Sequence, residues 1–194
     1  MFDEIGDYVR ALFEEHPSPL LLYHDLNHTL SVVGHAATIA DHYTLNDTDR
    51  FILITASYFH DTGHLLGYME GHEKISVEIM RDFFNDKDTI PAEADTIAAC
   101  ILATEWSARP QTLLEAIIRD ADTFHLGMPD FFDQDKRVWD EMEARTGKPV
   151  DHRTERTLRF MQVHRFYTDY CQALLNPGKQ HNMETLRSTI PNFK

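Results

Sequence analysis

Residues 51–64 read FILITASYFHDTGH, a segment that is apolar at its start and polar at its end. With helical spacing, residues 51–59 carry apolar side chains on nearly every side, and a helix that is hydrophobic all round is buried in the core. The helix reaches His60 and Asp61 and stops near Gly63, a residue type that commonly follows the end of a helix. The segment therefore predicts a central helix with two ionisable side chains at its end.

The rest of the chain shows the same helical spacing, and β-hairpin signals are missing. The predicted helices span residues 3–15, 28–42, 48–60, 72–85, 92–104, 111–125, 130–145 and 153–175. Turn-forming residues separate them, at positions 16–19, 46–47, 63–71, 91, 109–110, 127–129 and 176–178. Because these connections are short, the sequence predicts an all-α fold, a compact helical bundle.

The bulk composition limits the classes of function. The 194 residues, 42% hydrophobic and 26% charged, are typical of a globular protein, and we expect one domain over residues 1–194. The formal net charge of −14 argues against a nucleic-acid polymer or an anionic membrane as partner, because both bind basic faces. No segment has the length of a membrane span or the pattern of a signal peptide, so the expected location is cytoplasmic. Cys100 and Cys171 are expected to be buried thiols rather than a disulfide or a metal site.

Ionisable side chains interrupt the apolar faces of four predicted helices. They are His28, the pair His60 and Asp61, His72, and Asp122. Burying such groups unpaired would cost several kcal/mol. A metal ion that binds them together is the simplest explanation of this pattern.

Two segments, residues 23–29 (YHDLNHT) and 59–64 (FHDTGH), resemble the first two motifs of the HD superfamily of phosphohydrolases. Residues 72–76 (HEKIS) and 119–122 (RDAD) are similar to its later motifs, and the order His, His-Asp, Asp is the signature of that family. The resemblance covers a motif-bearing core of about residues 23–127 and leaves 128–194 as a helical C-terminal extension without a motif. The chain is also similar, more distantly, to cyclic-nucleotide phosphodiesterases.

The resemblance implies one divalent metal ion held by His28, His60, Asp61 and Asp122. Mixed imidazole and carboxylate ligands suit Zn, Mn, Ni, Co, Mg or Fe and leave positions open for water. Such an ion lowers the pKa of bound water and polarises a phosphoryl oxygen. The implied activity is hydrolysis of a phosphate ester or anhydride, with a small phosphorylated substrate of nucleotide size. His60 and Asp61 would diverge in a regular helix, but both can reach one ion at a helix end where Gly63 lets the backbone turn away.

The same resemblance assigns catalytic roles to His24, His64 and Asp61. His24 lies one helical turn before His28 and is expected to act as the general acid for the leaving oxygen. Its neighbour Asp25 stands where the phosphodiesterases have Asn. His64 is expected to contact a bound phosphate or a water near the metal.

Three further residues are assigned to the substrate or to a second metal: His72, Lys74 and Thr104. His72 is a candidate fifth ligand or a member of a second site. Lys74 is the cation expected to approach the substrate, ahead of Arg109 and Arg119. Two-metal members of the superfamily carry a further histidine where this chain has Thr104, which favours one metal and leaves Thr104 to contact substrate or a bound water.

Other functions stay open at this point. One is a regulator that binds metal or a nucleotide without turnover, and it would be favoured if His24 and His64 faced away from the metal. Another is a di-iron oxygenase on the same scaffold, which Thr104 disfavours and which two irons per chain would identify. A homodimer is also open, because Phe131, Phe132 and Trp139 can pack the core, wall a pocket or form a dimer face.

Overall fold

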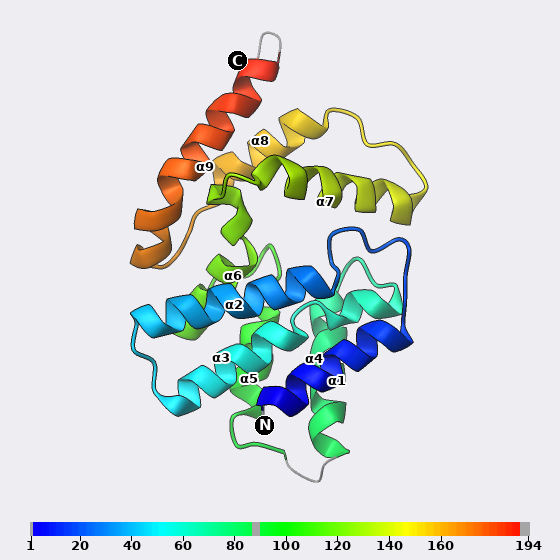
Figure 1. Cartoon of the computed structure of the whole chain (residues 1–194), viewed down its shortest axis with the longest axis vertical. Helices are drawn as coiled ribbons and strands as arrows, with labels where there is room; N and C mark the ends of the chain where they lie inside the picture. The colour runs from blue at the N-terminus through cyan, green and yellow to red at the C-terminus, as the bar shows by residue number, and fades with distance from the viewer. Residues whose placement is uncertain (1, 87–89, 191–194) are drawn as a thin grey trace.

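The computed structural model of the chain describes residues 2–86 and 90–190, so residues 191–194 of the C-terminal extension lie outside the described residues. Within those ranges the regular structure is helical, which confirms the all-α fold class. The helices are α1 (Phe2–Glu15), α2 (Leu26–His42), α3 (Asp47–Phe59), η1 (Thr62–Leu66), α4 (His72–Asn85), α5 (Ala94–Leu102), α6 (Leu113–Asp122), η2 (Phe124–Gly127), α7 (Phe131–Thr146), α8 (Arg153–Val163) and α9 (Asp169–Thr189), of which η1 and η2 are 3₁₀ helices. Figure 1 shows α1 to α6 gathered in one half of the molecule and α7 to α9 in the other.

The central helix is α3, as the sequence predicts. It packs against α1, α2, α4, α5 and α6, and residues 52–57 and Phe59 are buried. The side chain of Asn46 accepts a hydrogen bond from the backbone N–H of Asp49 (2.9 Å) and so caps the first turn. Because neighbouring helices surround α3, its C-terminal end delivers His60 to the interior, where that residue is 0% exposed.

The predicted helix over residues 153–175 is wrong at its middle. The chain forms two helices there, α8 and α9, and the connection between them begins at His164 with extended backbone (φ −64°, ψ 143°). The carboxylate of Asp120 on α6 accepts hydrogen bonds from the backbone N–H groups of Tyr167 and Thr168, both at 2.8 Å, and from the Thr168 hydroxyl at 2.7 Å. This contact between distant segments replaces the helical hydrogen bonds that the local pattern predicts.

The break predicted around Pro177 is also wrong, because α9 runs through that residue. Pro177 has no N–H and removes one hydrogen bond from the helix. Packing against η2 compensates: a Cβ on Gly178 would lie 2.0 Å from the carbonyl oxygen of Gly127, so the two backbones are in direct contact. Further along α9, Nδ2 of Asn182 donates to the carbonyl of Leu126 (3.0 Å).

Several smaller expectations can be checked directly on the fold. Cys100 and Cys171 are buried free thiols, as expected. Phe131 packs in the core, whereas Phe132 is 40% exposed, and Nε1 of Trp139 donates to a threonine hydroxyl on α8 (2.7 Å). Across the described ranges, no helix combines the length and the apolar character that crossing a membrane requires.

Candidate metal centre

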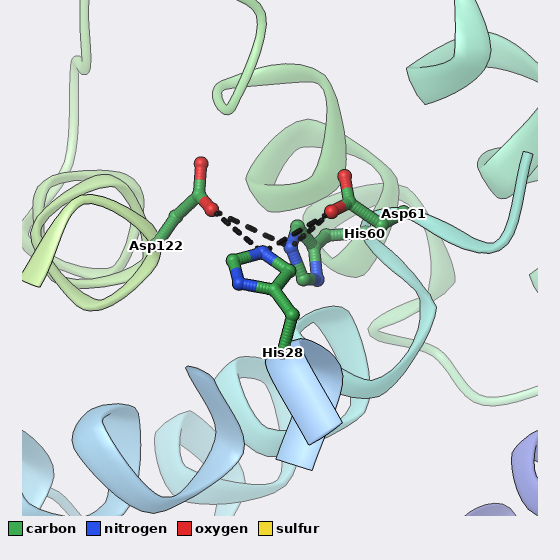
Figure 2. A group of neighbouring side chains, drawn as sticks. All are labelled: His28, His60, Asp61 and Asp122. Atoms are coloured by element: carbon green, nitrogen blue, oxygen red, sulfur yellow. Dashed lines mark ion pairs between the residues drawn. The ribbon is translucent and has the colours of Figure 1, made fainter. Parts of the chain in front are cut away.

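Four ionisable side chains from three helix ends converge on one point. His28 lies in the first turn of α2, where the side chain of Asp25 caps the helix by accepting a hydrogen bond from the His28 N–H (2.9 Å). His60 and Asp61 follow the end of α3, and Asp122 is the last residue of α6, which is shorter than predicted. Figure 2 shows the four side chains pointing toward one another.

The distances within this group are those of a compact cluster. Nε2 of His28 lies 3.2 Å from Oδ2 of Asp61 and 3.2 Å from Oδ1 of Asp122. Nε2 of His60 lies 3.1 Å and 3.7 Å from the same two oxygens. One ligand atom from each residue lies within 4.8 Å of all the others, so the four can hold one ion.

The atoms at the centre of the cluster lack hydrogen-bond partners, and this is the feature that fits a cation. Nε2 of His28, Nε2 of His60 and Oδ2 of Asp61 are buried, and within the part of the chain that the structure describes no hydrogen bond of suitable geometry reaches them. Nδ1–H of His60 donates to the carbonyl of Ser57 (2.9 Å), so the neutral ring keeps its lone pair on Nε2. Leaving these atoms unpaired would be costly, whereas one divalent ion would satisfy all of them.

The electrostatics of the cluster also favour a cation. Burial lowers the pKa of His28, but the carboxylates of Asp122 and Asp61, each 3.2 Å from its Nε2, outweigh it and raise that pKa to about 9. Burial likewise raises the pKa of Asp61, yet the charge of His60 and the proximity of the other imidazoles hold it well below its usual value. The carboxylates therefore stay ionised in the interior and need a positive charge. A proton on the imidazoles or a divalent ion can supply it, so the two compete for the site.

Three further histidines, His24, His64 and His72, form a row beside Asp61. Nδ1–H of His64 donates to the carbonyl of Tyr68 (2.8 Å), and Nδ1–H of His72 donates to another backbone carbonyl (3.1 Å). Nε2 of His72 lies 3.3 Å from Oδ1 of Asp61. The His64 ring stacks on the His72 ring, with centroids 3.8 Å apart, and lies 4.2 Å from the His24 ring. The structure thus brings all three sequence-predicted histidines to the edge of the cluster.

The sequence gives no sign of two residues that contact this row, Glu141 and Arg145 on α7. Glu141 is 2% exposed, its Oε1 lies 2.6 Å from Nδ1 of His24, and Arg145 donates to the same oxygen at 3.1 Å. Burial raises the pKa of Glu141, but hydrogen bonds from His24 and from two backbone N–H groups lower it to about 2. No local pattern distinguishes Glu141 from the other acids of α7, because its partner His24 lies 117 positions away.

The cluster opens into a cleft of about 1000 Å³, which Asp61 and Asp122 both line. Residues from segments 69–74, 104–109 and 160–167 wall the cleft, so its far side comes from the C-terminal extension. Lys74 and Thr104 line this cleft rather than the four-residue cluster. The Thr104 hydroxyl donates to a backbone carbonyl of α5 (2.8 Å).

Aromatic and basic side chains line the cleft. The rings of Trp106 and Phe160 lie on opposite segments of the wall with centroids 4.6 Å apart. Arg109 and Arg165 also line it. Arg119, the other candidate cation, is buried and donates to backbone carbonyls just after the C-terminal end of α5, where a cation is favourable.

Gly63 is required for a different reason from the one predicted. It is not among the glycines with positive φ, and the nearest left-handed backbone is at Gly67 (φ 86°) and Gly71 (φ 72°). A Cβ on Gly63 would lie 2.1 Å from the carbonyl oxygen of His72, and the Gly63 N–H donates to the Ser76 hydroxyl (2.9 Å). Gly63 therefore permits the close approach of η1 to α4, the two elements that carry His64 and His72.

His164, on the wall of the cleft, is buried in its neutral form. Its Nε2–H donates to the Thr123 hydroxyl (3.0 Å), whose own proton goes to the carbonyl of Arg119. Nδ1 of His164 is left buried without a partner in the described residues. Burial, together with the charge of Lys179, lowers the pKa of His164 from 6.5 to about 3.

We expect the free energy of unfolding to decrease as the pH falls from 6.5 toward 3, because the unfolded chain binds a proton at this residue and the folded chain resists it. This one group contributes a slope of up to about 1.4 kcal/mol per pH unit. His164→Gln should reduce the slope, as measured by urea unfolding across this pH range. His181→Gln, which changes an exposed histidine of α9, is the control. Equal slopes in the two variants would contradict the prediction.

Comparisons with known proteins identify a family and a similar fold. The HD domain family matches residues 25–127, a range that contains all four residues of the cluster and ends before α7. A crystal structure of a predicted HD superfamily hydrolase from an uncultured Thermotogales bacterium is similar in fold, with a TM-score of 0.63 and 17% sequence identity. The similarity covers 96% of this chain and 89% of that one. No curated protein matches the chain.

Proposed function

This chain belongs to the HD domain family, and from that premise we propose that it is a metal-dependent phosphohydrolase. Its substrate is a small phosphate ester or anhydride of nucleotide size. The observation that carries the proposal is the set of inward-facing, unpaired nitrogen and oxygen atoms at the edge of a large cleft. The proposed ligands of one divalent ion are His28, His60, Asp61 and Asp122.

The protein's own groups have distinct tasks in this proposal. A divalent ion bound by the cluster supplies a Lewis acid for phosphoryl oxygens and lowers the pKa of the attacking water. Asp61 would help to hold the ion, and its Oδ1 lies 3.3 Å from Nε2 of His72. His24, doubly protonated with its Nδ1–H bound to Glu141, would give the Nε2 proton to the leaving oxygen as the bond from phosphorus to that oxygen breaks and the bond from phosphorus to the water oxygen forms, and the attacking water would release its own proton to solvent. His64, with Nδ1 held by the Tyr68 carbonyl, turns its unpaired Nε2 to the substrate phosphate or its water.

The cleft supports a substrate larger than inorganic phosphate. Its volume of about 1000 Å³ is at the upper end of the range for small-molecule sites. Trp106, which packs on Phe160 and is 53% exposed, offers an aromatic face for a planar ring, and Lys74 and Arg165 offer positive charge for further phosphate oxygens. A nucleotide combines these two chemical features.

Metal content and hydrolysis, measured on the same preparation, test the proposal. Protein purified without added metal should carry about one divalent ion per chain, as four protein ligands around a single centre require. It should hydrolyse an aryl phosphate or members of a nucleotide panel, lose that activity with a chelator and regain it with a divalent ion. Bound metal without turnover on any phosphate would favour a non-catalytic regulator, and two irons per chain would favour an oxygenase. Failure to bind any of several divalent ions would refute the proposed centre.

A further inference from the structure

Glu141 of α7 is a buried carboxylate whose hydrogen bonds converge on one histidine. Oε1 accepts from Nδ1–H of His24 (2.6 Å), and Oε2 accepts from the backbone N–H groups of Tyr23 (2.7 Å) and His24 (2.9 Å). The residue is 2% exposed, so these contacts and one from Arg145 take the place of water. Both the backbone and the ring of His24 are thereby fixed to α7.

This contact determines which atom of His24 faces the cleft. An ionised carboxylate can only accept hydrogen bonds, so Nδ1 of His24 carries a proton and Nε2 is the atom left for chemistry. The ring lies 4.2 Å from the His64 ring, and ligand atoms of His24, Asp61 and His64 lie within 4.8 Å of one another. Nε2 of His24 is therefore held beside the proposed metal centre, where a leaving oxygen would be.

Arg145 extends the same support to His64. It lies one helical turn after Glu141, donates to Oε1 of Glu141 (3.1 Å), and donates from its second terminal nitrogen to the Tyr68 carbonyl (2.7 Å). Nδ1 of His64 lies 2.8 Å from that carbonyl oxygen and 3.0 Å from Nη1 of Arg145 itself. Glu141 thus contacts His24 directly, and its neighbour Arg145 contacts the carbonyl that binds His64.

Docking of α7 alone would not require such a pair. Taking a carboxylate and a guanidinium out of water is costly, and apolar side chains of similar size commonly stabilise an interface as well or better. Moreover, α7 begins after residue 127, beyond the part of the chain that matches the HD domain family. The pair therefore lies outside the part of the chain that the HD domain family matches.

We propose that Glu141 is the positioning residue for His24, so that α7 completes the site by fixing the group that protonates the leaving oxygen. The inference rests on the proposed phosphohydrolase function. It predicts an effect that depends on the leaving group. A phenolate ion needs protonation far more than a para-nitrophenolate ion, because the nitro group already stabilises the negative charge.

The test compares phenyl phosphate with para-nitrophenyl phosphate in metal-loaded wild type and Glu141→Gln. We expect kcat on phenyl phosphate to fall about 10- to 100-fold, the usual effect of losing an orienting partner, with little change on para-nitrophenyl phosphate and no change in metal content. Glu143→Gln is the matched control, because it neutralises a carboxylate on the same helix that pairs with Arg153 instead. Equal losses on both substrates in Glu141→Gln would overturn the proposal.

Two further variants keep the test decisive if Glu141→Gln folds poorly. Glu141→Asp retains the charge but withdraws the carboxylate by one methylene, and it should show the same dependence on the leaving group. His24→Gln should show it too, and adding Glu141→Gln to that variant should change the kinetics no further, because Glu141 acts through His24. A full additional loss in the double variant would overturn the proposal.

The ring of His24 can also be followed without turnover. Ring-nitrogen chemical shifts of zinc-loaded protein, assigned with His24→Gln, should report a proton on Nδ1 in wild type and a changed distribution of protons between Nδ1 and Nε2 in Glu141→Gln. If wild type hydrolyses no phosphate, the proposed function fails, yet this comparison still decides the role of Glu141. A changed distribution of ring protons supports the positioning, and identical shifts in the two proteins refute it.

Discussion

His60→Ala is expected to abolish binding of the divalent ion and hydrolysis of phosphate esters together. His60 is 0% exposed and directs Nε2 at both carboxylates of the cluster, 3.1 Å from Asp61 and 3.7 Å from Asp122. Its removal deletes one of four ligands and leaves the carboxylates of Asp61 and Asp122 with one fewer imidazole to balance their charge. Loss of an outer partner of a ligand already costs about 10- to 100-fold in metal affinity, and loss of the ligand itself should exceed that.

Metal analysis, thermal unfolding and phosphatase assays on one preparation check this expectation. Wild type should unfold at a higher temperature when a divalent ion is added, by an amount equivalent to about 2.7 kcal/mol when the free ion is at 100 times its dissociation constant. His60→Ala should show no such rise. His181→Ala removes an exposed imidazole from α9 and should behave as wild type. If His60→Ala kept its metal and its activity, His60 would not be a ligand and the proposed centre would have to be redrawn.

The parts of the molecule that could be predicted are those fixed by short-range pattern. The apolar run of residues 51–59 predicts α3 as the central helix, because a helix that is buried on every side carries apolar residues on every side in any fold. The residues of the cluster could be found because each interrupts or ends an apolar face, and because the resemblance to the HD superfamily selects these four as ligands. His28, His60 and Asp122 are found in this way, and the structure brings them to one point.

The parts that could not be predicted depend on contacts between distant segments. The chain leaves α8 at His164 because Asp120, far earlier in the sequence, binds the next backbone N–H groups. It stays helical through Pro177 because Gly178 packs on Gly127. Glu141 could not be predicted for the same reason. It is one acid among several in a charged helix, and only the fold brings it into contact with His24. Local helix propensity cannot predict such contacts, because the two partners lie far apart in the sequence.

Gly63 combines a feature that the sequence predicts with one that only the fold shows. Of the substitutions proposed for this protein, Gly63→Ala should lower the free energy of unfolding most. The sequence marks Gly63 as essential to the end of α3, but the reason is the approach of another backbone. A Cβ there would lie 2.1 Å from the carbonyl oxygen and 3.0 Å from Cα of His72. Because these are backbone atoms, no side-chain rotation can relieve the overlap, and η1 and α4 must move apart.

We therefore expect Gly63→Ala to lower the free energy of unfolding by about 3 kcal/mol or more, at the upper end of the cost of overpacking. The separation of η1 from α4 should also weaken metal binding. Asp61 directly precedes η1 and His72 begins α4, and Oδ1 of Asp61 lies 3.3 Å from Nε2 of His72, so moving the two elements apart displaces a proposed ligand. Gly34→Ala is the matched control: a Cβ there meets nothing within 4 Å, and α2 should gain about 0.5–1 kcal/mol from the lost flexibility of the unfolded chain. Urea unfolding of the metal-free proteins and metal titration of the folded ones measure the two effects separately. If Gly63→Ala unfolded at the same urea concentration as wild type, η1 and α4 would not be in contact and the arrangement of His64 on His72 would be wrong.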